Sequence, residues 1–297
     1  MDKNTANNWK NNVLDIIFEA LAESEVLLDC IVFKGARILN KRLESYSRQS
    51  LDIDANILKE FLDKYENYAQ LQEILEIEIS ESIVNYLEKQ ETVIYELDKL
   101  RVIKKPNKDH KLGWNAFEVS ISIKDLSQRS VRGLPKLKID IAAPEELGEN
   151  SISALNIGAS TVTAYTLERI SGEKLRAFLS SLPTYRSKVK KPGKAIRAKD
   201  IYDIARILER YPISNGPFWD IASKEFVCAC RSRFLDCIGV QTFEEELKIT
   251  EDTYNSDLTI PNDIKFEEAW QSLLSIVNYF TEEKVFPFYF PLPENLE

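Results

Sequence analysis

Two aspartates separated by one residue, Asp52 and Asp54, have the type and spacing to do chemistry. Their segment is apolar and β-prone. Successive side chains of a strand point to opposite faces, so both carboxylates would share one face, while Leu51, Ile53 and Ala55 share the other. Carboxylates held side by side repel each other unless a cation lies between them, and a hard divalent cation such as Mg²⁺ prefers oxygen ligands. The pair therefore predicts a metal site suited to phosphoryl or nucleotidyl transfer.

A small-residue turn precedes this pair. The segment 31–33 is apolar and predicts a short buried strand, and Lys34, Gly35 and Ala36 follow it directly. A helix is expected from about Arg37 to Arg48. A turn without bulky side chains at the start of a helix lets a polyphosphate approach backbone N–H groups and the positive end of the helix dipole.

A third carboxylate comes from the segment 136–142, which alternates between apolar and polar residues. Leu137, Ile139 and Ile141 would form the buried face of a strand, and Asp140 would point to the other face. If this strand lies near the one that carries the aspartate pair, Asp140 completes a metal site of three acids.

Taken in order, these motifs resemble the DNA polymerase β-type nucleotidyltransferase superfamily. The order is 34–36, then Ser50-x-Asp52-x-Asp54, then Asp140. The second half is similar to the AbiEii/AbiGii nucleotidyltransferase toxins of type IV toxin–antitoxin and abortive-infection systems. That similarity rests on the segment 165–177, which contains Lys174, and on the segment 197–204. The resemblance covers residues from about 31 to 208.

The resemblance implies a Mg²⁺-dependent transfer of a nucleoside monophosphate from an NTP, with two metal ions held by Asp52, Asp54 and Asp140. It also implies a cognate antitoxin and an acceptor that is an RNA, such as a tRNA 3′ end, or a protein. The residues implied as catalytic are Asp52, Asp54, Asp140, Lys174 and Asp200. Those implied in nucleotide binding are Lys34, Gly35, Ala36, Ser50, Lys174 and Asp203.

One departure from the family pattern concerns the turn. The family carries Lys-Gly-Gly-Thr-Ala-Leu where this sequence has Ala36 and Arg37 after Lys34-Gly35. If position 36 requires a positive φ, the methyl group of Ala36 strains the turn, and Arg37 alters the phosphate contact. This departure motivates one alternative, a degenerate protein that binds nucleotide or RNA without activity. A second alternative is a small-molecule nucleotidyltransferase of the aminoglycoside-modifying type.

The arrangement of elements predicts an α+β fold, with a small mixed-sheet nucleotidyltransferase lobe at residues 1–144. A mainly helical lobe at 145–297 would close the nucleotide cleft. Hydrophobic periodicity predicts strands at 31–33, 51–54, 117–123 and 136–142. It predicts helices at about 9–28, 57–75, 81–100, 166–181, 199–211, 218–236 and 266–280, with Asn56 as the cap of the second of these.

Charge and composition restrict the partners. The net charge of −9 argues against unspecific nucleic-acid binding over the whole surface. A local basic run, expected to be a loop, contains no acidic residue between positions 186 and 199. It is either a solvated loop or a contact for RNA phosphates, and its candidate RNA-binding residues are Arg186, Lys188, Lys190, Lys191, Lys194 and Arg197.

Other sequence features indicate no membrane or thiol chemistry. No apolar run of about 18 residues predicts a membrane span, and the polar start of the sequence lacks the apolar stretch of a signal peptide, so a cytoplasmic location is expected. The four cysteines include Cys228 and Cys230, whose spacing is too tight for a usual zinc site. We expect buried, reduced thiols.

Overall fold

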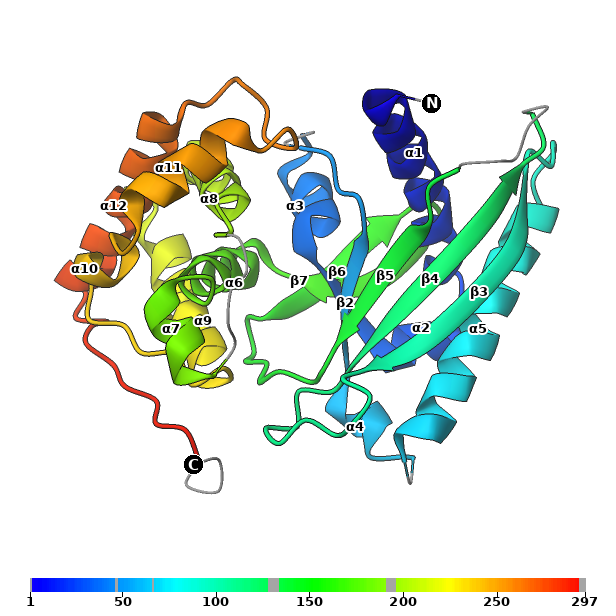
Figure 1. Ribbon diagram of the computed structural model, residues 1–297, viewed down its shortest axis with the longest axis horizontal. Helices are drawn as coiled ribbons and strands as arrows, with labels where there is room; N and C mark the ends of the chain where they lie inside the picture. The colour runs from blue at the N-terminus through cyan, green and yellow to red at the C-terminus, as the bar shows by residue number, and fades with distance from the viewer. Residues whose placement is uncertain (1, 46–47, 66, 128–133, 191–195, 294–297) are drawn as a thin grey trace. The chain divides into compact units, whose positions relative to one another are not determined.

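The computed structural model describes residues 2–45, 48–65, 67–127, 134–190 and 196–293 (Figure 1). The chain forms two compact units, each of which draws on separate parts of the sequence. The first, called the sheet unit, comprises Met1–Ile38, Gln49–Glu145 and Ser153–Tyr165. The second, called the helical unit, comprises Leu39–Arg48, Glu146–Ile152 and Thr166–Glu297. The assignment of functional lobes to residues 1–144 and 145–297 stays a prediction.

A seven-stranded mixed sheet has the strand order β3-β4-β5-β2-β1-β7-β6 (Figure 1). β2 runs parallel to β5, β1 runs parallel to β7, and the pairs β1–β2, β3–β4 and β4–β5 are antiparallel. The strands are β1 (Ile31–Lys34), β2 (Ile53–Ile57), β3 (Tyr95–Lys105), β4 (Ala116–Asp125), β5 (Leu137–Ala142), β6 (Ile152–Ile157) and β7 (Ser160–Tyr165).

Strict alternation along β4 and β5 gives the sheet one buried face and one partly exposed face. The buried face contains Leu137, Ile139 and Ile141, as the sequence predicts, together with Phe117, Val119, Ile121 and Ile123 of β4. On the opposite face, backbone register places four charged residues in one row. Lys34 lies opposite Asp54, Asp54 opposite Asp140, and Asp140 opposite Glu118.

Helices cover the sheet unit and protect part of its edge. They are α1 (Lys3–Ala22), α2 (Glu25–Cys30), the start of α3 (Gly35–Leu43), α4 (Lys59–Leu62) and α5 (Tyr68–Glu88). α5 runs beside β3 in Figure 1 and buries a leucine or isoleucine at every fourth position from Leu71 to Leu87. It also satisfies two donors of this edge strand, because Glu76 accepts a hydrogen bond from the backbone N–H of Val102 and Gln72 accepts one from Lys104.

The helical unit is built around a close crossing of α6 (Leu167–Leu179) and α9 (Gly216–Arg231). Gly172 permits the contact, because a Cβ at this position would lie 2.5 Å from the backbone nitrogen of Phe226. The other helices are α7 (Pro183–Lys188), α8 (Lys199–Arg210), α10 (Val240–Phe243), α11 (Leu247–Ser256) and α12 (Phe266–Glu282).

The predicted α+β class is confirmed, and several local predictions are wrong. The helix expected over 81–100 ends at Glu88, and β3 begins at Tyr95. The strands β6 and β7 lie after residue 145, where a mainly helical lobe was expected and no strand was predicted. Asn56 does not cap a helix, because it lies within β2, is buried, and donates a hydrogen bond of 2.8 Å to the Tyr165 hydroxyl. No described helix is both long enough and apolar enough to cross a membrane.

Candidate metal centre and ion-pair cluster

Three predicted carboxylates meet on the partly exposed face of the sheet unit. Each of Asp52, Asp54 and Asp140 offers an oxygen atom, and these atoms all lie within 4.8 Å of one another. Asp54 and Asp140 are direct neighbours in the parallel pairing of β2 with β5. Asp52 differs from its prediction, because it lies in a bend just before β2 begins at Ile53. The backbone therefore holds like charges together in a geometry that favours a cation.

Gly35 is required by the position of Asp54. Its φ is +81°, and a Cβ built on it would lie 2.1 Å from Asp54 Oδ2. Both the left-handed backbone and the close approach exclude a side chain. The expected strain at Ala36 is absent, because Ala36 lies in α3 and is not among the residues with positive φ. The turn therefore needs one glycine, at position 35, and the alanine that follows is compatible with it.

Arg37 points into the protein and supports the segment that leads to Asp52. Its guanidinium is only 5 % exposed and forms an ion pair with Asp15. It also donates hydrogen bonds to the carbonyl oxygen of Ser50, at 2.7 Å, and to Asn11 Oδ1, at 3.4 Å. The sequence predicted that Arg37 alters a phosphate contact, whereas in the structure its guanidinium contacts other residues of the sheet unit. It fixes the backbone two residues before Asp52, the first of the three carboxylates.

Ser50 and Lys34 are both engaged within the sheet unit. Ser50 is buried, and its hydroxyl donates a 3.1 Å hydrogen bond to the backbone oxygen of Asp52. The Lys34 ammonium lies 3.9 Å from Glu145 Oε1 and 5.7 Å from the centroid of the Tyr165 ring. Their predicted contacts with a nucleotide stay predictions.

Two lysines near the three carboxylates were not anticipated from the sequence. Lys138 Nζ lies 2.8 Å from Asp140 Oδ2 and 3.1 Å from Glu118 Oε2. Burial lowers the pKa of Lys138, but its hydrogen bonds to both carboxylates give a net increase. Lys10 on α1 interacts electrostatically with Asp52 and Asp140, and burial lowers its pKa. Alternation on β5 could have indicated that Lys138 shares a face with Asp140, whereas nothing in the sequence connects Lys10 to the site.

These residues fit a divalent cation. Carboxylate oxygens are the ligands that Mg²⁺ prefers, and three of them converge from two neighbouring strands and the bend before one of them. Because residue 35 is a glycine, no Cβ occupies the space that the Asp54 carboxylate needs. Mutual repulsion of the three acids is relieved when a cation binds between them.

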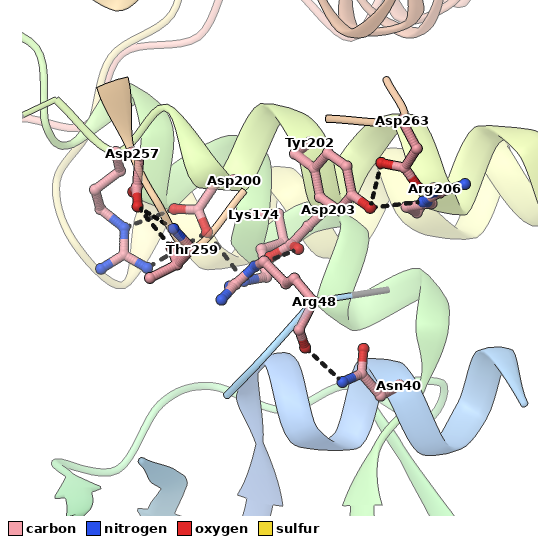
Figure 2. Close-up of polar contacts among 11 residues, drawn as sticks. Asn40, Arg48, Lys174, Asp200, Tyr202, Asp203, Arg206, Asp257, Thr259 and Asp263 are labelled. Atoms are coloured by element: carbon pink, nitrogen blue, oxygen red, sulfur yellow. Dashed lines mark hydrogen bonds and ion pairs between the residues drawn. The ribbon is translucent and has the colours of Figure 1, made fainter. Parts of the chain in front are cut away.

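A second cluster of charged residues lies in the helical unit (Figure 2). Lys174 of α6 is buried, and its ammonium is 2.9 Å from Asp200 Oδ1 and 2.6 Å from Asp203 Oδ2 on α8. Arg48 donates two hydrogen bonds to Asp203, of 2.8 and 2.9 Å. Arg197 donates two to Asp200, of 2.6 and 3.4 Å. The two aspartates are three residues apart in the sequence and therefore share one side of α8.

The charges in this cluster stabilise one another in a buried setting. Burial raises the pKa of Asp200, but the positive charges of Arg197 and Lys174 hold it well below its ordinary value. The pKa of Asp203 is lowered in the same way by Arg48 and Lys174. Neither aspartate caps α8, because the N-cap is Ala198 and forms no side-chain cap. Sequence analysis missed Arg48, which is distant from Asp203 in the chain and carries no motif of its own.

Lys199 adds a further positive charge beside this cluster. Burial lowers its pKa, and the charges of Arg48 and Arg197 lower it further. The four cations Arg48, Lys174, Arg197 and Lys199 thus interact with two carboxylates, Asp200 and Asp203. Lysine and arginine side chains are the ones that contact anions such as phosphate groups.

The basic run is divided by the fold. Arg186 and Lys188 lie on α7, where a loop was expected, and Lys188 contacts Asp236 at 2.6 Å and the backbone oxygen of Phe290 at 2.8 Å. Lys190 is exposed just after this helix. Arg197 belongs to the ion-pair cluster, whereas Lys191 and Lys194 lie outside the described residues. An RNA contact by this run stays a prediction.

Comparison with known proteins connects these features to a family. The family described as "Nucleotidyl transferase AbiEii toxin, Type IV TA system" matches residues 17–288. None of the curated proteins matches the sequence. Among solved structures, the nucleotidyltransferase toxin MenT4 from Mycobacterium tuberculosis H37Rv has a TM-score of 0.51 and 12% identity, over 98% of this chain and 86% of that chain. The antibiotic-resistance factor ANT(2'')-Ia has a TM-score of 0.30 and 14% identity, over 83% of this chain and 93% of that chain.

Proposed function

Because the chain belongs to the AbiEii family of nucleotidyltransferase toxins, we propose that it transfers a nucleoside monophosphate from an NTP to the 3′ end of an RNA, with tRNA as the favoured acceptor. The family membership makes the protein a nucleotidyltransferase toxin of a type IV toxin–antitoxin system, so a cognate antitoxin is the expected partner. The observation that carries the proposal is the convergence of Asp52, Asp54 and Asp140 on one face of the sheet.

In this proposal the three aspartates hold divalent cations, with two Mg²⁺ ions as the expected number. When bound, such ions would offset the negative charge of the triphosphate and of the attacking oxygen. Asp140 would accept the proton of the acceptor hydroxyl, and its carboxylate lies 2.8 Å from the Lys138 ammonium. Gly35 and Arg37 would act through position, by leaving space for Asp54 and by fixing the backbone at Ser50.

The cluster around Lys174 supports a phosphate-binding role in the helical unit. Lys174 is held by two carboxylates, so it is fixed in place, and the nearby charges of Arg197 and Lys199 supply the positive excess. Asp200 would orient Lys174, and Asp203 would orient both Lys174 and Arg48. The basic run at 186–197 would provide contacts for RNA phosphates.

A labelling experiment tests the proposal directly. Purified protein is incubated with each α-³²P-labelled NTP, Mg²⁺ and total cellular RNA, and the products are separated on a denaturing gel. We expect a labelled RNA band with the wild type and none with Asp52→Ala. The matched control is Asp98→Ala, which removes an exposed aspartate on β3 and should leave the band unchanged.

The other outcomes of the labelling experiment lead to different conclusions. Label on a protein band or on an aminoglycoside would retain the nucleotidyltransferase and replace the acceptor. Label that persists in Asp52→Ala would refute the assignment of the metal centre. If no acceptor is labelled although calorimetry shows that an NTP binds, the protein is a binding module without transfer activity.

A further inference from the structure

Lys138 occupies a position between a metal ligand and a carboxylate outside the metal centre. Its ammonium lies 2.8 Å from Asp140 Oδ2 and 3.1 Å from Glu118 Oε2. Glu118 also contacts Lys105, at 2.7 Å. Since Glu118 lies directly opposite Asp140 in the β4–β5 pairing, backbone register fixes the distance between the two carboxylates.

One oxygen of Asp140 is therefore contacted by a cation of the protein itself. A divalent ion that coordinates Asp140 would bring positive charge next to the Lys138 ammonium, and like charges at this range repel. Lys138 has a second acceptor within reach, because Glu118 already contacts it. The side chain of Lys138 is 40% exposed, so solvent allows it to shift without leaving a buried charge unpaired.

We propose that Lys138 is an internal counter-cation of the metal centre, which moves from Asp140 to Glu118 when a divalent cation binds. Without the metal, Lys138 reduces the repulsion among the three carboxylates. With the metal, Glu118 retains the ammonium beside the site, where its charge sets the affinity for the ion. The inference rests on the proposed function in so far as the three aspartates are taken to bind a metal, and Lys138 and Glu118 are positioning residues in it.

The proposal is tested by measuring Mn²⁺ binding to the full chain. Electron paramagnetic resonance monitors the binding, and neither NTP nor acceptor is present. Lys138→Met removes the competing cation, so the Kd for Mn²⁺ should fall about fivefold. Glu118→Gln removes the alternative acceptor, so Lys138 stays on Asp140 and the Kd should rise about fivefold. A purely structural role of either residue would weaken binding in both variants.

The double variant separates the exchange of Lys138 from simple charge effects. If Glu118 acts through Lys138, Glu118→Gln should change the Kd less than about twofold in the Lys138→Met background. If Glu118 acts only by its charge, the effect stays about fivefold in both backgrounds and the proposal is overturned. The matched control is Lys124→Met, which breaks the exposed 2.8 Å pair with Glu96 across β3 and β4 and should leave the Kd unchanged.

Failure of the Lys138 proposal can be distinguished from failure of the proposed function. Asp52→Ala should abolish the Mn²⁺ signal, and if it does while Lys138→Met leaves the Kd unchanged, the Lys138 proposal is wrong and the metal centre stands. If the wild type binds no Mn²⁺, both proposals are refuted. If the predicted shifts occur but no acceptor is labelled, the Lys138 proposal holds and the proposed transfer reaction is refuted.

Discussion

Replacing Gly35 with alanine should damage both the fold and the candidate metal centre. The left-handed backbone at Gly35, with φ of +81°, costs a non-glycine residue about 1–2 kcal/mol. The new Cβ would also lie 2.1 Å from Asp54 Oδ2, so the Asp54 side chain must leave its position. An off-rotamer side chain adds about 1 kcal/mol. We therefore expect Gly35→Ala to lower the free energy of unfolding by about 2–3 kcal/mol.

Gly113 provides a control that isolates the contact with Asp54. Its φ is +69°, similar to that of Gly35, but a Cβ built on it would meet no atom within 4 Å. Gly113→Ala should therefore lose only the backbone contribution, about 1–2 kcal/mol. The difference between the two variants in urea denaturation measures the cost of displacing Asp54.

Metal binding gives the more direct measurement. Gly35→Ala displaces one of three carboxylate ligands, so the Kd for Mn²⁺ should rise at least about tenfold, which corresponds to about 1.4 kcal/mol. Gly113→Ala should leave this Kd unchanged. If both variants have the same urea midpoint and both bind Mn²⁺ as the wild type does, Gly35 does not position Asp54 and the reasoning is refuted.

Three further predictions follow from buried and half-buried charges. Arg37→Met should lower the free energy of unfolding by about 2 kcal/mol in urea denaturation, because the Ser50 carbonyl loses its donor; an unchanged midpoint would contradict this role. Asp203→Asn removes the carboxylate that pairs with the buried Arg48 guanidinium, so the free energy of unfolding should fall by about 3 kcal/mol. The lowered pKa values of Asp200 and Asp203 mean that the unfolded state binds more protons, so their contribution is complete above their ordinary pKa and is lost as pH falls below it. The wild type should therefore lose more stability than Asp203→Asn between pH 5 and the acid limit, and parallel curves would disprove the coupling. Lys10→Ala should lower the Kd for Mn²⁺ about twofold at an unchanged melting temperature, because it removes a cation that interacts with Asp52 and Asp140, and an unchanged Kd would exclude Lys10 from the site.

Sequence periodicity predicted β5, the strand that carries Asp140, because its side chains alternate strictly. β5 is buried at every second residue, so Asp140 had to face away from Leu137, Ile139 and Ile141. Periodicity failed at β3, where the exposed and half-buried residues of an edge strand show no clean alternation. It also failed at Asn56, whose polar side chain suggested a cap although Tyr165, far away in the chain, provides its partner.

The residues that support the predicted site residues could not be identified from the sequence, because they make contacts with residues far away in the chain. Arg48 meets Asp203 across 155 positions of the chain, and neither has a spacing that indicates the other. Arg37 could be identified from the sequence only as a departure from the family pattern. Its internal role depends on Asp15 and Asn11, which lie on α1. Register, in contrast, brought Glu118 to the site once β4 was paired with β5.

The two clusters bring together charges of opposite sign, carboxylates in the sheet unit and lysines and arginines in the helical unit. Each cluster is therefore suited to a different ligand. In the sheet unit, backbone register and a bend bring three carboxylates within 4.8 Å, with Lys138 bound at the outer edge through Asp140 and Glu118. That excess of negative charge is satisfied by a hard cation. In the helical unit, two buried carboxylates fix Lys174 and two arginines, and Lys199 adds to the positive charge. In the proposed function, these cations would contact a phosphate. The proposed transfer from an NTP would use a cation site and a phosphate site, and each of the two arrangements has the charge that one of these sites needs.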